Sequence, residues 1–178
     1  MAAILGLEDE TVSGVCRDAA QGEVVQPVNY NAPGQVVVAG NAAAVERAVA
    51  LAKEAGAKRA LLLPVSVPSH CELMQPAAQR LAERLNEVAF TAPGIPVVHN
   101  ADVQTHADPA EIRDVLARQL YSPVRWVETI QTLAGQGVDR LIECGPGKVL
   151  VGLNKRIERG MTALPVYDGA TLETALAE

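Results

Sequence analysis

Aromatic residues are scarce in this sequence, at 3% of its 178 residues, and long apolar runs are missing altogether. A membrane-spanning helix needs about 18–20 consecutive apolar residues, and no run approaches that length. The N-terminus has no basic segment before an apolar stretch, so we expect no secretory signal peptide. With so few aromatics, the core must be packed from alanine, valine and leucine, which suits helices laid on a mostly parallel sheet. These absences predict a cytoplasmic protein that does not act on a membrane.

Cysteine and histidine are also rare. The cysteines are Cys16, Cys71 and Cys144, and the histidines are His70, His99 and His106. No C-x-x-C pair is present, which argues against a disulfide framework or a zinc ribbon. Cys16 and Cys144 have apolar neighbours and are expected to be buried thiols. Because the histidines and Cys71 fit no common zinc spacing, we expect no metal site.

An excess of positive charge is lacking too. The net charge of −6 argues against nonspecific nucleic-acid binding, which needs a basic footprint. Two local basic clusters remain, one made of Lys53, Lys58 and Arg59 and the other of Lys148, Lys155, Arg156 and Arg159. Solvated surfaces account for most clusters of this kind. We therefore expect no nucleic-acid partner.

The sequence contains no G-x-S-x-G element, which carries the nucleophilic serine in many α/β enzymes. Its serines are Ser13, Ser66, Ser69 and Ser122, and none lies between flanking glycines at a strand-to-helix turn. The Gly145-Pro146-Gly147 run lacks the spacing of a phosphate-binding loop, so a tight structural turn is expected there.

Residues 1–67 show the order β-α-β-β-α-β. The apolar spacing predicts strands at 2–6, 24–30, 35–39 and 58–67, and helices at 9–20 and 41–55. Asn31-Ala32-Pro33-Gly34 has the chemistry of a turn, and Asn41 is a suitable helix cap. This order is the ferredoxin-like arrangement, and it predicts a small subdomain that ends at residue 67.

Residues 68–178 alternate helices with short strands. Helices are predicted at 70–88, 108–120, 122–135, 148–159 and 171–177, and strands at 96–99, 139–144 and 162–166. Asp108, Pro109 and Glu111 form a strong helix-start signal. The alternation predicts an α/β subdomain with a largely parallel sheet. Because such strands are normally central in a larger covered sheet, this sheet is expected to lack some of its members.

Four segments in order resemble the malonyl-CoA:acyl-carrier-protein transacylases. They are Pro27-Val28-Asn29-Tyr30-Asn31-Ala32-Pro33-Gly34-Gln35, Val65-Ser66-Val67-Pro68-Ser69-His70, Arg118-Gln119-Leu120-Tyr121-Ser122-Pro123 and Glu143-Cys144-Gly145-Pro146-Gly147-Lys148-Val149-Leu150. The resemblance covers essentially the whole chain and implies a ferredoxin-like subdomain followed by the C-terminal part of a hydrolase-like α/β subdomain. It also implies that the family's serine, its malonate-binding arginine and its oxyanion hole belong upstream of residue 1.

The resemblance implies an acyltransferase of fatty acid synthesis that moves malonyl from malonyl-CoA to the phosphopantetheine thiol of acyl carrier protein through a seryl ester. His70 would be the catalytic proton shuttle, oriented by the backbone carbonyl of Gln119. No cofactor is implied, since malonyl-CoA is a substrate and phosphopantetheine belongs to the partner. Without its serine, this chain is expected to be inactive alone.

Further roles are open at this stage. Asn29, Asn31 and Ser69 are candidates for substrate binding, although turn formation and helix capping account for them equally well. Lys58 and Arg59 are candidates for docking the acidic carrier protein. The alternatives for the whole chain are a part of a polyketide-pathway acyltransferase and a non-enzymatic module that binds carrier protein or CoA.

Overall fold

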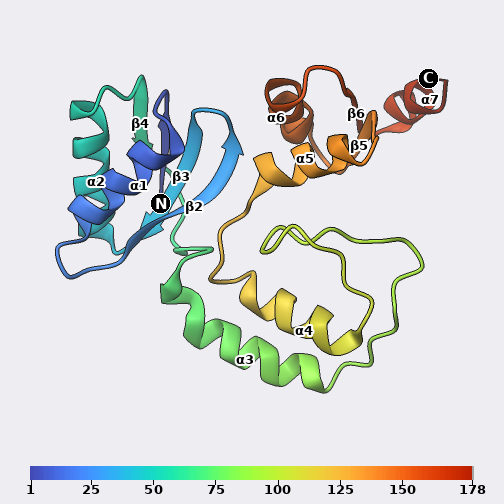
Figure 1. Cartoon of the computed structure of the whole chain (residues 1–178), viewed down its shortest axis with the longest axis horizontal. Helices are drawn as coiled ribbons and strands as arrows, with labels where there is room; N and C mark the ends of the chain where they lie inside the picture. The colour runs from blue at the N-terminus through green and yellow to red at the C-terminus, as the bar shows by residue number, and fades with distance from the viewer. Residues whose placement is uncertain (178) are drawn as a thin grey trace. The chain divides into compact units, whose positions relative to one another are not determined.

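The computed structural model describes residues 1–177 and divides the chain into two compact units, a first unit of Met1–Trp126 and a second unit of Val127–Glu178. In chain order (Figure 1), the elements are β1 (Ala2–Leu5), α1 (Asp9–Ala20), β2 (Val25–Ala32), β3 (Gln35–Gly40), α2 (Ala42–Glu54), β4 (Arg59–Leu62), the short 3₁₀ helix η1 (Glu72–Met74), α3 (Gln75–Asn86), α4 (Pro109–Arg118), α5 (Trp126–Gly135), β5 (Arg140–Cys144), α6 (Val149–Ile157), β6 (Thr162–Val166) and α7 (Gly169–Ala177).

The first unit contains a four-stranded sheet in the order β2-β3-β1-β4, in which every neighbouring pair is antiparallel. Helices α1 and α2 pack against each other and lie on one face of this sheet (Figure 1). The predicted ferredoxin-like arrangement is confirmed. The predicted subdomain boundary at residue 67 stays a prediction.

The two helices bury stripes of small side chains at helical spacing, which lets them approach the sheet closely. In α1 the buried residues are Val12, Val15, Cys16 and Ala19, and in α2 they are Ala44, Val45, Ala48 and Ala52. Asn41 occupies the N-cap position of α2, but its side chain makes no capping bond. Its Oδ1 instead accepts from the backbone N–H of Val24 at 2.8 Å. The predicted position of the cap is confirmed, but the side chain bonds to the residue before β2 and not to its own helix.

Strand β3 is covered on both of its faces, which explains why it buries four residues in succession. Val36 and Val38 belong to the core beneath α1 and α2, whereas Val37 packs on the opposite face with Val28 and Cys71. Because successive side chains of a strand point to opposite faces, a continuous apolar run marks a strand that is buried on both sides. The second cluster positions the candidate site described below.

Three predictions for the following segment need correction. The helix predicted from residue 70 begins as α3 only at Gln75, after η1. Residues 96–99 form no strand, and Val98 makes only an isolated bridge to Thr105, because residues 91–97 are exposed and have no strand to pair with. The helix predicted from residue 122 begins as α5 at Trp126, because the backbone of Val124 bonds to β2.

In the second unit, β5 and β6 form a parallel pair whose register runs from Arg140 opposite Thr162 to Cys144 opposite Val166. The parallel pairing agrees with the prediction for this region. Cys144 was expected to be buried but is exposed, because β5 lacks cover on the side to which Cys144 points; Cys16 is buried as expected. The predicted tight turn at residues 145–147 connects β5 to α6.

Candidate active site

His70 lies in the connection between β4 and α3, and two bonds fix it to consecutive carbonyls. Its backbone N–H donates to the carbonyl of Leu120 at 2.9 Å. Its ring Nδ1 lies 2.8 Å from the carbonyl oxygen of Gln119. The amide Nε2 of Gln119 lies farther from the same atom, at 3.4 Å. Because a carbonyl only accepts, the shorter contact assigns the hydrogen of the neutral ring to Nδ1 and the lone pair to Nε2. The arrangement leaves Nε2 as the nitrogen that can accept a proton.

The backbone of His70 is in the left-handed region, with φ of 66°. Residues other than glycine adopt this region rarely, and such conformations gather at functional sites where the surroundings enforce them. Here the two bonds to residues 119 and 120 enforce it. The half-buried ring is therefore held in one orientation rather than free to rotate.

Cys71 anchors the connection to the sheet. Its side chain is fully buried on the face away from α1 and α2, against Val37 and Ala39. Its Sγ donates to the carbonyl of Pro68 at 3.2 Å, and burial raises the pKa of this thiol. A thiol that stays protonated is a poor nucleophile. The side chain thus serves as an apolar anchor beside His70.

Gln119 is positioned by helix α4, at whose C-terminal end it lies. Asp108 caps the start of this helix, as predicted, by accepting from the N–H of Ala110 at 2.7 Å. Gln119 is the C-cap, and its side-chain Nε2 donates to the carbonyl of Ser122 at 3.3 Å. The chain leaving α4 is therefore folded back on itself where it meets His70.

Val124 ties the same segment to β2. Its N–H donates to the carbonyl of Val28 at 2.8 Å, and its carbonyl accepts from the N–H of Tyr30 at 3.0 Å. Asn29 lies between these two bonds and forms a parallel bridge with Val124. Residues 119–124 thus connect Asn29 with His70. Asn31, half-buried, lies two residues farther along β2, beside an irregularity between Tyr30 and Ala32, and no bond ties it to this segment.

The other sequence-predicted residues lie as follows. Ser69 is half-buried next to His70, and it caps neither η1 nor α3, so the capping alternative is wrong. Lys58 and Arg59 are exposed at the start of β4, whereas the connection to His70 leaves the other end of this strand. A Cβ atom placed on Gly6 would come within 2.7 Å of Cγ of Lys58, so the stem of this lysine lies over the turn after β1.

Two anchors were not anticipated as parts of the site. One is Cys71, and the other is Gln26, whose Oε1 accepts from the N–H of Glu72 at 3.0 Å. The four-residue apolar run in β3 was a signal for Cys71, because it required cover on both faces of the sheet. Nothing in the sequence around Gln26 indicated its contact.

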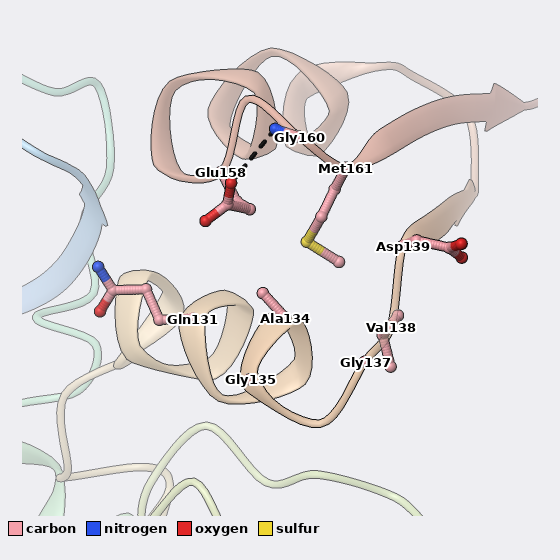
Figure 2. Close-up of a pocket in the computed structure, with 9 residues that line it drawn as sticks. All are labelled: Gln131, Ala134, Gly135, Gly137, Val138, Asp139, Glu158, Gly160 and Met161. Carbon is pink, nitrogen blue, oxygen red and sulfur yellow. Dashed lines mark hydrogen bonds between the residues drawn. The ribbon is translucent and has the colours of Figure 1, made fainter.

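A cavity of about 480 Å³ lies in the second unit, at the ends of α5 and α6 (Figure 2). The thioether of Met161 points into it, and Glu158 accepts there from the N–H of Gly160 at 3.2 Å. None of the residues expected to act in chemistry lines this cavity. Within residues 1–177, no group of three metal-ligating side chains comes together, and no helix has the length and apolarity to cross a bilayer.

Comparison with known proteins matches residues 2–166 to the family described as "Acyl transferase domain". A malonyl CoA-acyl carrier protein transacylase of Salmonella typhimurium is 55% identical over 178 residues, which are all of this chain and 58% of that protein. An acyl carrier protein S-malonyltransferase of Vibrio cholerae has a solved structure with a TM-score of 0.96 and 60% identity, covering 98% of this chain and 57% of that one.

A third relative is a malonyl-transacylase solved in complex with its type II polyketide acyl carrier protein. It has a TM-score of 0.97 and 53% identity, and the match covers 99% of this chain and 57% of that one. The chain therefore spans a little over half the length of the relatives that it matches.

Proposed function

Since this chain belongs to the family of acyl transferase domains, we propose that it forms the histidine-bearing part of a transacylase that moves malonyl from malonyl-CoA to the phosphopantetheine thiol of an acyl carrier protein. The observation that carries the proposal is the 2.8 Å contact between Nδ1 of His70 and the carbonyl of Gln119. It favours the tautomer that a general base needs, in which Nε2 carries the lone pair.

In the proposed reaction, His70 moves one proton in each half-reaction. A serine hydroxyl from outside these 178 residues attacks the thioester carbonyl, its proton passes to Nε2, and CoA leaves as the thiol by taking that proton. The carrier-protein thiol then gives its proton to Nε2, and its sulfur attacks the seryl ester. The serine oxygen leaves and regains the proton. The carbonyl of Gln119 stabilises the transient imidazolium by accepting from Nδ1.

The test is a chimera in which this chain replaces the matching part of the Salmonella relative, to which it is 55% identical. We expect the chimera to transfer malonyl, and His70→Ala to lower kcat by about 10²–10⁴-fold, the usual contribution of a positioned base. Ser66→Ala, an exposed position in the same connection, is the matched control and should retain activity. An active His70→Ala chimera would overturn the proposed role.

The chain alone tests where the nucleophile lies. None of its four serines stands in a G-x-S-x-G element, so incubation with malonyl-CoA should leave the intact mass unchanged. A stable malonyl adduct on this chain would contradict the view that the nucleophile lies outside it.

Asn29, Asn31 and Ser69 are the proposed substrate-binding residues. Asn29 has the firmest support, because residues 119–124 connect it to His70. We expect Asn29→Ala in the chimera to raise KM for malonyl-CoA more than it lowers kcat, since it removes a binding contact. A change confined to kcat would assign Asn29 to another role.

Lys58 and Arg59 are the proposed docking site for the acidic carrier protein, on the ground that both are exposed and adjacent. Reversing both charges should slow the transfer to carrier protein and leave loading from malonyl-CoA nearly unchanged. Arg17→Glu, at another exposed arginine, is the control. Equal losses in both half-reactions would contradict docking at this pair.

Fatty-acid and polyketide carrier proteins are both candidate partners. The polyketide carrier protein has specific support from the complex of its own malonyl-transacylase, which is 53% identical to this chain. Comparing transfer rates to the two kinds of carrier protein in the chimera distinguishes them.

A further inference from the structure

The carbonyl that binds His70 belongs to Gln119, and the residue before it, Arg118, forms two ion pairs. Arg118, at the end of α4, precedes Gln119 directly. Its Nη2 donates to Oδ2 of Asp102 at 2.9 Å, and its Nε donates to Oδ2 of Asp114 at 2.7 Å. The contact with Asp114 lies within α4 itself, whereas Asp102 reaches the helix from a separate loop. Of the two carboxylates, Asp102 is therefore the one that links the end of α4 to another part of the first unit.

Asp102 is well suited to hold such a contact. Its side chain is 20% exposed, against 66% for Asp114. Besides Arg118, it accepts from Nε2 of His106 at 3.0 Å and from the N–H of Gln104 at 3.2 Å. Partial burial alone would raise its pKa, but these three donors together lower it, so the carboxylate stays charged. Charge-assisted bonds to a partly buried carboxylate are stronger and more directional than exposed pairs.

The loop that carries Asp102 is closed on itself. Val98 bridges to Thr105, and the N–H of Val103 donates to the carbonyl of His99 at 2.8 Å. Val103 is buried with φ of 59°, a conformation that β-branched residues almost never adopt unless their surroundings impose it. A loop held in one shape in this way can transmit a fixed position to the groups that it contacts.

The same loop, residues 98–105, bonds to both ends of the segment 118–125 that follows α4. Asp102 holds Arg118 at the start, and the carbonyl of Asn100 accepts from the N–H of Arg125 at 3.2 Å at the far end. Between these points lie the two carbonyls that bind His70. Residues 98–105 therefore hold the two ends of this segment, while β2 holds it through the backbone bonds of Val124.

From this arrangement we propose that Asp102 is a positioning residue for His70: by holding Arg118, it keeps the adjacent carbonyl of Gln119 against Nδ1 of the histidine. The inference rests on the proposed catalytic role of His70 for its meaning in the reaction. Its structural content, that Asp102 controls the tautomer of His70, stands apart from that role and is measured separately.

The test uses the 178-residue chain, labelled with ¹⁵N, and reads the ring nitrogens of His70 by NMR. In the native chain, we expect Nδ1 to be protonated and Nε2 unprotonated when the ring is neutral. In Asp102→Asn, the weaker bond to Arg118 should release the carbonyl of Gln119. The ring signals should then shift toward the mixture of tautomers found in unrestrained histidine. Asp102→Glu, which keeps the charge, should restore the native signals in part.

Asp114→Asn is the matched control. It removes the same kind of charge from the same arginine, but within α4, and should leave the ring signals of His70 native. Arg118→Gln tests the same link from the other side and serves if Asp102→Asn fails to fold. Native ring signals in both Asp102→Asn and Arg118→Gln would overturn the proposal, and so would an equal effect of Asp114→Asn.

The chimera supplies the kinetic counterpart. Asp102→Asn there should lower kcat by about tenfold with little change in KM for malonyl-CoA, because a misplaced base weakens the chemical step and not substrate binding. If His70→Ala left the chimera active, the proposed function would fail while the NMR result still decided the positioning. If His70 proved essential but its tautomer did not change in Asp102→Asn, only the proposed positioning role of Asp102 would fail.

Discussion

The two units differ in how fully each covers its own sheet. In the first unit the inner strands are well covered: Ile4 of β1 is 1% exposed, and β3 buries four residues in succession. Only the edge strand β4 leaves large apolar side chains in water, with Leu61 48% and Leu62 55% exposed. In the second unit, Ile142 at the middle of β5 is 41% exposed, Cys144 at its end is exposed, and α7 contributes no buried residue. Both regions have apolar strands with helices beside them, so composition alone does not explain the difference.

The order of strands and helices along the chain explains the difference in cover better than composition does. In the first unit, two helices that are close in sequence to the strands cover one face, and the residues around Cys71 cover part of the other. The parallel pair of the second unit has α6 as its crossover helix, and α7 also packs on β6 but buries no residue. Since parallel strands are normally covered on both faces, we expect the second unit to open at a lower free energy than the first.

The largest expected contrast is between two isoleucines in the middle of strands. Ile4→Ala should lower the free energy of unfolding of the first unit by about 2–5 kcal/mol, the range for truncating a buried isoleucine. Ile142→Ala should cost the second unit less than about 1 kcal/mol, because much of the side chain is already in water. Native-state amide exchange reads each unit separately. Equal losses would show that β5 is buried as well as β1.

Two glycines give the next contrast, and their effects should have opposite signs. A Cβ on Gly40 would lie 2.0 Å from the backbone oxygen of Val24, so Gly40→Ala forces two strands apart and should cost about 1–3 kcal/mol. In α6, Gly152 has nothing within 4 Å. Gly152→Ala should therefore stabilise the second unit by about 0.5–1 kcal/mol through helix propensity. A loss of stability in Gly152→Ala would reveal a close contact at that helix face.

A single carboxylate links strand and helix in the second unit. Oε2 of Glu143, in β5, accepts from the N–H of Val151 at 2.7 Å and satisfies the third amide of α6. Glu143→Ala should cost the second unit about 1–2 kcal/mol, as the loss of a helix cap does. Amide exchange in α6 measures this, with β1 as the internal control. Unchanged exchange in α6 would mean that the turn at residues 145–147 suffices to start the helix.

Much of the fold could be read from the sequence because local patterns decided it. The spacing of Val12, Val15 and Ala19 predicted α1, and the Asp108-Pro109 signal predicted α4. The predictions failed where a distant partner decided the structure. Val124 bonds to β2 and delays the start of α5, and the side chain of Asn41 bonds to Val24 instead of its own helix.

Some residues of the candidate site could likewise be predicted from the sequence, and others could not. The resemblance indicated His70 and Gln119, and the structure brings their atoms to hydrogen-bonding distance, although their roles stay predictions. Asp102 could not be found from the sequence, because its link to Arg118 spans sixteen residues and a loop with an unusual conformation at Val103. Aspartate and arginine at such a separation carry no pattern that distinguishes a contact from chance.

The smallest expected effect depends on pH and follows from where the histidines lie, since all three belong to the first unit. The hydrogen bond with Asp102 raises the pKa of His106, with help from Glu111, so its contribution to stability is complete below its unfolded pKa and is lost as pH rises through its folded pKa. Burial lowers the pKa of His99, as does the neighbouring charge of His106, and its contribution is lost as pH falls.

His106→Gln separates the two histidines. The stability difference between the native chain and this variant should shrink as pH rises from about 6 to about 8, because only His106 loses its contribution in that direction. In β5 and β6, which contain no histidine, the opening free energy should be the same in both proteins across this range. A stability difference that grew with pH would mean that His106 is held neutral in the folded chain. The network around Asp102 would then depend on Arg118 alone for its positive charge.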